Sequence, residues 1–244
     1  MTRKKFLVSF VSISIFIFVV IGHAETTYTI IDNLRNRDDD VVEATCKKIG
    51  LDRGVVGLEK VQLLSPCFEI AGRSLFIVGL SWEGPIEGYL ILLDKDGNVL
   101  DKFRVGYIGQ LSLVQLQQKY LDDFLLVDAI KGTGAGMRVD QYTILSITNK
   151  GFLKLWEGVS YERSSPGKVA PDDNYSIEAF VTFKDIDNDG NLELLYHKKI
   201  VKYRYMPKEK QFKAQPASRK TEIYKLKMIG TQKYILKKIG DVLK

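Results

Sequence analysis

From Arg73 onward the chain repeats one pattern, in which a run of aliphatic and aromatic residues is followed by a short polar turn and a second such run. β-Branched and aromatic residues favour strands, and Gly, Asn and Asp favour the tight turns that join antiparallel neighbours. These turns fall at Asp96-Gly97, at Asn149 to Gly151, at Pro207 to Lys210 and at Gly230. The pattern therefore predicts a mainly β chain built from antiparallel hairpins.

Two architectures agree with these hairpins. The turns near residues 97, 150 and 209 lie about 50 to 60 residues apart, a spacing typical of the blades of a β-propeller. A two-sheet sandwich accommodates the same strands. We therefore expect a propeller-like or two-sheet antiparallel β architecture, formed by a single domain over residues 25–244 with a basic portion over residues 197–244.

A short segment near the N-terminus departs from the β pattern. Asp38, Asp39 and Asp40 precede the sequence VVEATCKKIG, which closes with two lysines and Gly50. Acids at the first turn, bases at the last and a glycine just beyond are typical of an α-helix. We expect one short helix here, and a short strand from Tyr28 to Ile31.

Residues 1–24 have the three parts of a secretory signal peptide. Basic residues precede an apolar run from Phe6 to Ile21, and small residues stand at the cleavage position, Gly22-His23-Ala24. The run is shorter than the roughly 20 residues that a membrane span requires, although an uncleaved anchor is the alternative. After cleavage we expect no transmembrane span, and a protein that is periplasmic or extracellular.

The sequence has two cysteines, Cys46 and Cys67. Exported proteins fold in an oxidising compartment, where such a pair forms a disulfide. The alternative is two separate buried thiols. A disulfide would tether the N-terminal helix to the β structure.

Charge is distributed unevenly along the chain. Residues 25–196 contain 18 Lys and Arg against 27 Asp and Glu, whereas residues 197–244 contain 15 against 3. Alternation along the predicted strands suggests that the basic residues gather on one sheet face that could bind an anionic ligand. The candidate residues are Lys202, Arg204, Lys225, Lys227, Lys233 and Lys237. An anionic envelope polymer or another envelope protein would suit this face, whereas solvated lysines that protect exposed strand edges are the alternative. We expect no nucleic-acid partner outside the cell.

The stretch KDIDNDGNLELLY, residues 184–196, concentrates acids in a tight loop. Calcium is a hard cation that takes six to eight oxygen ligands, and carboxylates at alternate positions before a glycine supply them. The predicted ligands are Asp185, Asp187, Asp189, the Asn191 carbonyl and Glu193. The alternative is a solvated polar turn.

Strands rather than helices flank this loop, and Tyr196 stands where an EF-hand has its last glutamate. The combination of strand, D-x-D-x-D-G-x-x-E and strand resembles the calcium loops of FG-GAP/VCBS-type repeats, found in integrin-like β-propellers. The resemblance covers one copy, roughly Tyr175 to Tyr196. It implies a structural Ca²⁺ ion held by the residues named above.

Signals for catalysis are weak. The glycines of KGTGAGMR precede a strand pattern rather than a helix, which disfavours a dinucleotide site. His197 is the one histidine after residue 24, so a histidine-rich metal site is excluded. We expect no catalytic residues and a non-catalytic binding or scaffold protein of the cell envelope. An envelope hydrolase that uses a carboxylate pair is one alternative, and a module that binds anionic polymers is another.

Overall fold

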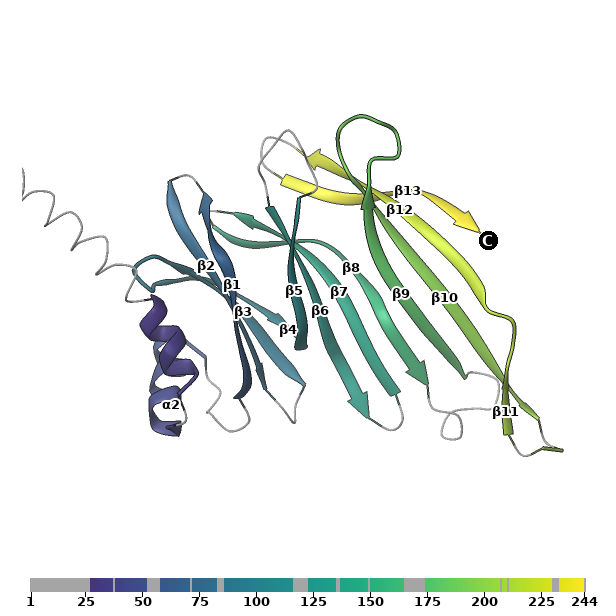
Figure 1. Ribbon diagram of the computed structural model, residues 1–244, viewed down its shortest axis with the longest axis horizontal. Helices are drawn as coiled ribbons and strands as arrows, with labels where there is room; N and C mark the ends of the chain where they lie inside the picture. Colours follow the sequence, from purple (N-terminus) through teal and green to yellow (C-terminus); the bar gives the residue numbers. More distant parts are fainter. Residues whose placement is uncertain are drawn as a thin grey trace, which may run out of the picture.

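The computed structural model describes residues 27–36, 38–51, 58–70, 72–82, 86–115, 123–134, 137–148, 150–164, 174–206, 208–209, 211–229 and 233–243. The predicted signal peptide lies outside these residues. Strands dominate, and the chain is elongated, with its helices at one end and strands β10 and β11 at the other (Figure 1). Within the described residues, no helix combines the length and apolar character that a membrane span needs.

Two helical segments precede the strands in the described part of the chain. Residues 27–34 are helical, so the strand expected from Tyr28 to Ile31 is wrong: Ile30, Ile31 and Leu34 share one buried helix face. Helix α2 (Asp39–Lys48) confirms the second expectation, and the Asp38 carboxylate accepts the N–H of Asp40 at its N-terminus.

All thirteen labelled strands pair antiparallel with their neighbours, as the turn chemistry predicts. The first sheet has the order β1-β2-β3-β4, and the second has the order β13-β12-β10-β9-β8-β7-β6-β5, with β11 added to β10. Their bounds are β1 Leu58–Ile70, β2 Arg73–Trp82, β3 Glu87–Asp94, β4 Val99–Val105, β5 Tyr107–Gln115, β6 Asp123–Gly134, β7 Met137–Thr148, β8 Gly151–Ser164, β9 Tyr175–Lys184, β10 Glu193–Met206, β11 Gln211–Ala214, β12 Ser218–Ile229 and β13 Lys233–Leu243. The two-sheet antiparallel architecture is confirmed.

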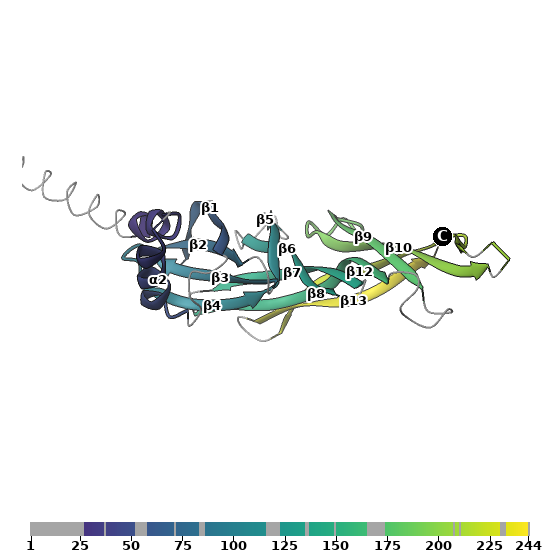
Figure 2. The same cartoon turned by 90° about the horizontal axis from the view of Figure 1, so that it is seen from below.

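Three apolar clusters fill the interior. The first lies between the helices and one face of β2 and β3, and the second joins the opposite face of these strands to β5, β6 and β7. Edge-on views show the helices at the end of the thin, extended pair of sheets (Figure 2). The second cluster therefore holds the two sheets together.

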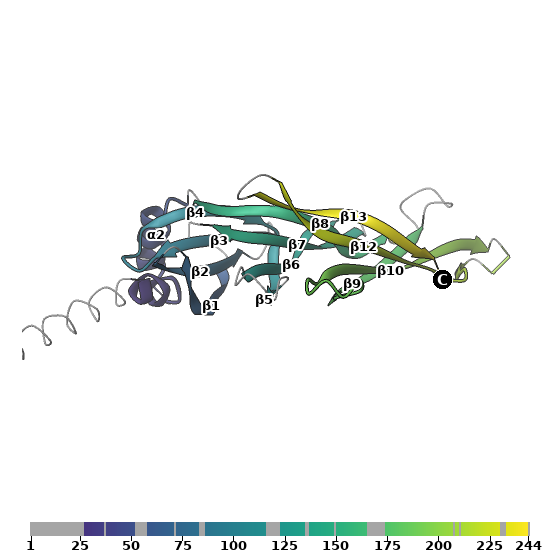
Figure 3. The ribbon, with the colours of Figure 1, turned by 90° about the horizontal axis from the view of Figure 1, so that it is seen from above.

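The third cluster lies where the second sheet curls. Trp156 on β8 packs edge-to-face against Tyr196 on β10 and Tyr224 on β12, with ring centroids 5.0 and 5.7 Å away. Strand β13 contacts β8 at this place, and the two run along the same side of the molecule (Figure 3). The face of β9, β10, β12 and β13 that carries Tyr196 is therefore covered, and we call it the Tyr196 face. The opposite side of these strands is the His197 face.

Cys46 lies on α2 and is fully buried, and it forms no disulfide within the described residues. Burial among apolar side chains raises the pKa of this thiol, and the nearby Glu43 adds to the effect. Cys67 belongs to β1, but its side chain lies outside the described residues. The disulfide between them stays a prediction.

Candidate metal centre and an adjoining groove

The acidic loop, residues 185–192, connects β9 to β10 at the tip of a hairpin. Asn188 and Gly190 take left-handed backbone conformations, with φ of 58° and 83°, which glycine adopts freely and asparagine tolerates. The carboxylate of Asp185 accepts the N–H of Asp189 at 3.2 Å and the N–H of Gly190 at 2.9 Å. The backbone therefore folds around the Asp185 side chain.

Three acids converge at this loop, two from the loop itself and one from the first residue of β10. Asp185, Asp187 and Glu193 each offer a carboxylate oxygen within 4.8 Å of the other two. Glu193 is fully buried, and its Oε2 accepts the N–H of Ile186 at 2.9 Å. Its Oε1 is also buried but receives no hydrogen bond from any residue that the structure describes. Because a buried carboxylate oxygen without a donor is costly, this atom marks the position where a cation would be most stabilising.

Lys225 on β12 is the counter-charge of the loop. Its Nζ lies 2.5 Å from Asp187 Oδ2 and 2.6 Å from Asp189 Oδ2. It lies 3.5 Å from Glu193 Oε1, close enough for an ion pair but without a hydrogen bond. The hydrogen bonds to Asp187 and Asp189 raise the pKa of Lys225, and the bond from Lys225 holds the pKa of Asp189 below its usual range. The loop therefore attracts positive charge.

The structure divides the five predicted ligands into two groups. Asp185, Asp187 and Glu193 form the cluster. Asp189 turns one oxygen to Lys225 and the other to Asn191, which donates its backbone N–H at 2.9 Å and its side-chain amide at 3.0 Å. Asp189 and Asn191 therefore shape the wall of the loop.

The predicted basic face divides between both sides of the sheet. His197 pairs with Thr221, which puts odd-numbered residues of β10 and β12 on the His197 face. Lys225 and its cross-strand neighbour Lys237 lie on this face. By the same alternation Lys202 and Arg204 lie on the Tyr196 side, so the six residues do not form one surface. The side chains of Lys227 and Lys233 lie outside the described residues.

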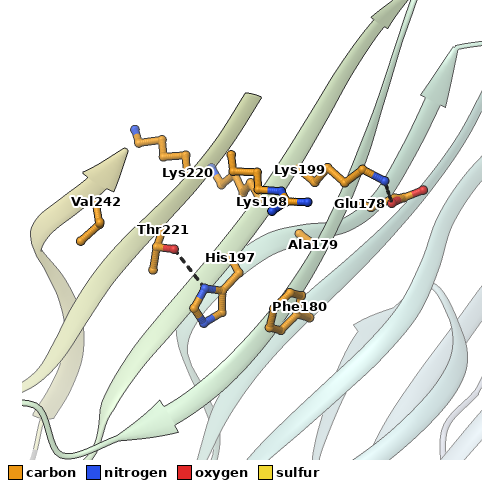
Figure 4. A pocket seen from close by; sticks show the side chains of 10 residues that line it. Glu178, Ala179, Phe180, His197, Lys198, Lys199, Lys220, Thr221 and Val242 are labelled. Atoms are coloured by element: carbon orange, nitrogen blue, oxygen red, sulfur yellow. Dashed lines mark hydrogen bonds and ion pairs between the residues drawn. The ribbon is translucent and has the colours of Figure 1, made fainter. Parts of the chain in front are cut away.

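A groove of about 410 Å³ crosses the His197 face (Figure 4). One row of its lining is formed by the register partners Phe180, His197, Thr221 and Val242, from β9, β10, β12 and β13 in turn; we call it the aromatic row. The ring of Phe180 stacks on that of His197, with centroids 4.5 Å apart and planes inclined by 22°. Phe180 is nevertheless 55% exposed and Val242 is 43% exposed.

His197 is held rigidly in the aromatic row. Its Nε2 lies 2.9 Å from the hydroxyl of Thr182, and its Nδ1 lies 3.0 Å from that of Thr221. Both ring nitrogens are therefore engaged by side chains of the sheet. The imidazole fixes the position of the Phe180 ring that stacks on it.

The next row along the strands is charged. Glu178, Lys199 and Arg219 are register partners two residues from the aromatic row, and we call them the charged row. Lys199 Nζ lies 2.8 Å from Glu178 Oε2. Within the described part of the chain, Arg219 forms no ion pair. Glu178 is the one acid among the residues that line the groove.

On the covered Tyr196 face, Glu222 binds several cations. Its Oε1 lies 2.9, 3.2 and 3.6 Å from the ammonium groups of Lys198, Lys220 and Lys238, and Tyr224 donates its hydroxyl proton to Oε2 at 2.7 Å. Burial alone would raise the pKa of Glu222, but the hydrogen bonds from Tyr224, Lys198 and Lys220 outweigh it and lower the pKa to about 2. The ionised carboxylate therefore stabilises the fold.

This low pKa gives a pH-dependent prediction. Because the folded pKa lies below the ordinary value of 4.5, the contribution of Glu222 is complete above pH 4.5 and is lost as pH falls toward 2. Urea unfolding at pH 6 should show Glu222→Gln less stable than the parent by about 2 kcal/mol, a value reduced for solvent screening of the lysines. The difference should shrink at pH 3. Glu157→Gln, which removes an exposed ion pair with Lys154, is the matched control; a deficit at Glu222 that persists unchanged at pH 3 would contradict the prediction.

One acid pair bears on the hydrolase alternative. Burial raises the pKa of Asp128, whose carboxylate accepts the hydroxyl of Ser160 at 2.9 Å, and the nearby charge of Asp140 raises it further. Asp140 accepts three hydrogen bonds from Arg138. These acids lie on β6 and β7 and do not line the groove.

Comparison with family models, with curated proteins and with solved structures found no match for the chain. Two features of the described structure bear on the function of the chain: the acidic loop with Lys225, and the groove on the His197 face.

Proposed function

We propose that this chain is an exported, non-catalytic binding or scaffold protein of the cell envelope, with one structural calcium ion in the loop between β9 and β10. The observation that carries the proposal is the buried Oε1 of Glu193, which has no hydrogen-bond donor among the described residues, in a carboxylate that clusters with those of Asp185 and Asp187. A hard cation that prefers oxygen ligands would satisfy all three groups together.

The residues in and beside the acidic loop have different roles in this proposal. Asp185, Asp187 and Glu193 would bind the ion directly, while Gly190 allows the turn and Asp189 orders the backbone through Asn191. The arrangement agrees with the resemblance to FG-GAP/VCBS-type loops, which implies a structural ion. The proposed relation to that family concerns this loop, because the strands form a four-stranded and a nine-stranded sheet rather than a ring of four-stranded blades.

The function of such an ion would be to fix the hairpin of β9 and β10. This hairpin carries Phe180, His197 and Lys199, which line the groove. Extracellular calcium sites bind at about 10⁻⁴ to 10⁻³ M, so a modest site would be filled outside the cytoplasm. The ion would then stabilise a binding surface without taking part in chemistry.

Thermal unfolding tests this proposal. Calcium at about 100 times its dissociation constant adds about 2.7 kcal/mol to the stability of the folded protein, which should raise the melting temperature by about 5 to 10 °C relative to chelator. Asp187→Asn should lose most of this increase, because it removes one of the three converging carboxylates. Mg²⁺ should give little increase, since it demands a smaller and more regular site.

Asp96→Asn provides the matched control, because Asp96 lies in another hairpin turn, between β3 and β4. This variant should respond to calcium as the parent does. The proposal is wrong if the parent shows no calcium-dependent increase, or if Asp187→Asn shows the full increase.

A further inference from the structure

The groove on the His197 face combines two chemically different rows at a fixed spacing. Successive residues on one face of a strand lie about 7 Å apart along it. The aromatic row and the charged row are therefore separated by about the width of one sugar or aromatic ring. A ligand lying in the groove can contact both rows at once (Figure 4).

The aromatic row provides a flat apolar surface. Phe180 remains more than half exposed even though one side of its ring stacks on His197. Since Thr182 and Thr221 hold His197, this surface is formed before any ligand binds. A preformed aromatic surface reduces the entropy that binding must overcome.

Four cations line the groove: Lys198, Lys199, Arg219 and Lys220. Lys198 and Lys220 are paired with Glu222, and Lys199 is paired with Glu178. Arg219 is therefore the cation left for an anion, and Glu178 is the acceptor for a hydroxyl. Arg219 has no ion-pair partner in the described part of the chain, and its planar guanidinium matches a carboxylate. Glu178 accepts hydrogen bonds but repels further negative charge. The charged row therefore favours a ligand with one carboxylate and neighbouring hydroxyl donors.

We propose that this groove binds an acidic sugar unit of a polysaccharide, with the C–H face of the ring on Phe180, the carboxylate at Arg219 and a hydroxyl at Glu178. The volume of about 410 Å³ is in the range of small-ligand sites. This inference rests on the proposed binding function and names the class of its ligand.

Other anionic ligands match these residues less well. A phosphate chain carries more charge than one unpaired arginine neutralises, and it has no hydroxyl to donate to Glu178. A lipid headgroup would bring acyl chains, for which the exposed apolar residues of the groove, Phe180 and Val242, offer little surface. An acidic sugar unit matches both the aromatic row and the charged row.

The acidic loop lies on the His197 face, at the tip of the hairpin formed by β9 and β10. Glu193 and His197 are four residues apart on β10, which corresponds to about 13 Å along the strand. A fixed loop therefore holds the end of the two strands that carry Phe180 and His197. We expect sugar binding to be tighter in calcium than in chelator.

Calorimetric titration of the purified protein with trigalacturonate, in excess calcium, tests the inference. Trigalactose tests the need for the carboxylate, and adenosine monophosphate tests whether a phosphate ligand binds instead. The parent should bind trigalacturonate at least about tenfold more tightly than either. Arg219→Ala and Phe180→Ala should each weaken this binding by about tenfold or more. Arg204→Ala, an exposed arginine on the opposite side of β10, and Ile239→Ala, an exposed residue outside the groove, should bind as the parent does.

Three results would overturn the inference: no binding of trigalacturonate, equal or tighter binding of trigalactose or adenosine monophosphate, or unchanged binding by Arg219→Ala and Phe180→Ala. The melting experiment in calcium is independent of all three. If calcium raises the melting temperature but trigalacturonate does not bind, the ligand class is wrong and the calcium site stands.

Discussion

Replacing Lys225 with methionine is expected to raise the calcium affinity of the acidic loop by about tenfold or more, and to destabilise the calcium-free protein. The Lys225 ammonium contacts Asp187 and Asp189 and lies 3.5 Å from Glu193 Oε1, so a cation entering the cluster must displace it or share the carboxylates with it. An opposite charge at such distances shifts proton binding by about one to three powers of ten. Calcium binding to the same groups should shift by a similar order.

The two effects of this substitution have opposite directions. In chelator, Lys225→Met leaves the buried Glu193 without its nearest positive charge, so the melting temperature should fall. In millimolar calcium it should recover. Lys237→Met, at the cross-strand position next to Lys225, controls for the loss of a lysine on this face. Unchanged calcium affinity in Lys225→Met would show that the ammonium and calcium do not compete.

Replacing Gly106 with alanine is expected to disrupt the fold. Gly106 links β4 to β5, where the chain passes from the first sheet to the second. A Cβ at this position would lie 1.7 Å from the carbonyl oxygen of Ile130, a backbone atom that cannot move away alone. The required shift would separate β5 from β6 beside the second apolar cluster. We expect a loss of more than about 3 kcal/mol, or failure to fold.

Gly132→Ala is the matched substitution, because a Cβ there meets no atom within 4 Å. Urea unfolding, or the yield of folded protein where unfolding cannot be measured, compares the two. A Gly106→Ala protein as stable as Gly132→Ala would contradict the close approach of the two sheets at this position.

Local turn chemistry made several of the strand pairs predictable. The turns at Asp96-Gly97 and near Gly151 connect β3 to β4 and β7 to β8, as tight polar turns between apolar runs require. Helix α2 was predictable from its acidic start and basic end. Residues 27–34 were misread because their apolar side chains contact the first cluster, which local sequence does not reveal. The order of the strands within each sheet also depends on such long-range contacts.

The candidate site was predictable only in part. The D-x-D-x-D-G-x-x-E spacing identified the three acids that converge, because they lie close together in sequence at the tip of one hairpin. Lys225 is 36 residues beyond Asp189, and only the register of β10 with β12 brings it to the loop. The groove was missed for the same reason, since Phe180, His197 and Arg219 meet through the pairing of three strands.

The central claim is that Asp185, Asp187 and Glu193 bind one calcium ion, and calorimetric titration of calcium into the metal-free protein tests it most directly. The account predicts one site per chain with a dissociation constant of about 10⁻⁴ to 10⁻³ M, lost in Glu193→Gln. Absence of binding at 10-fold higher calcium, or the same binding in Glu193→Gln, would contradict it and leave the loop as a polar turn neutralised by Lys225.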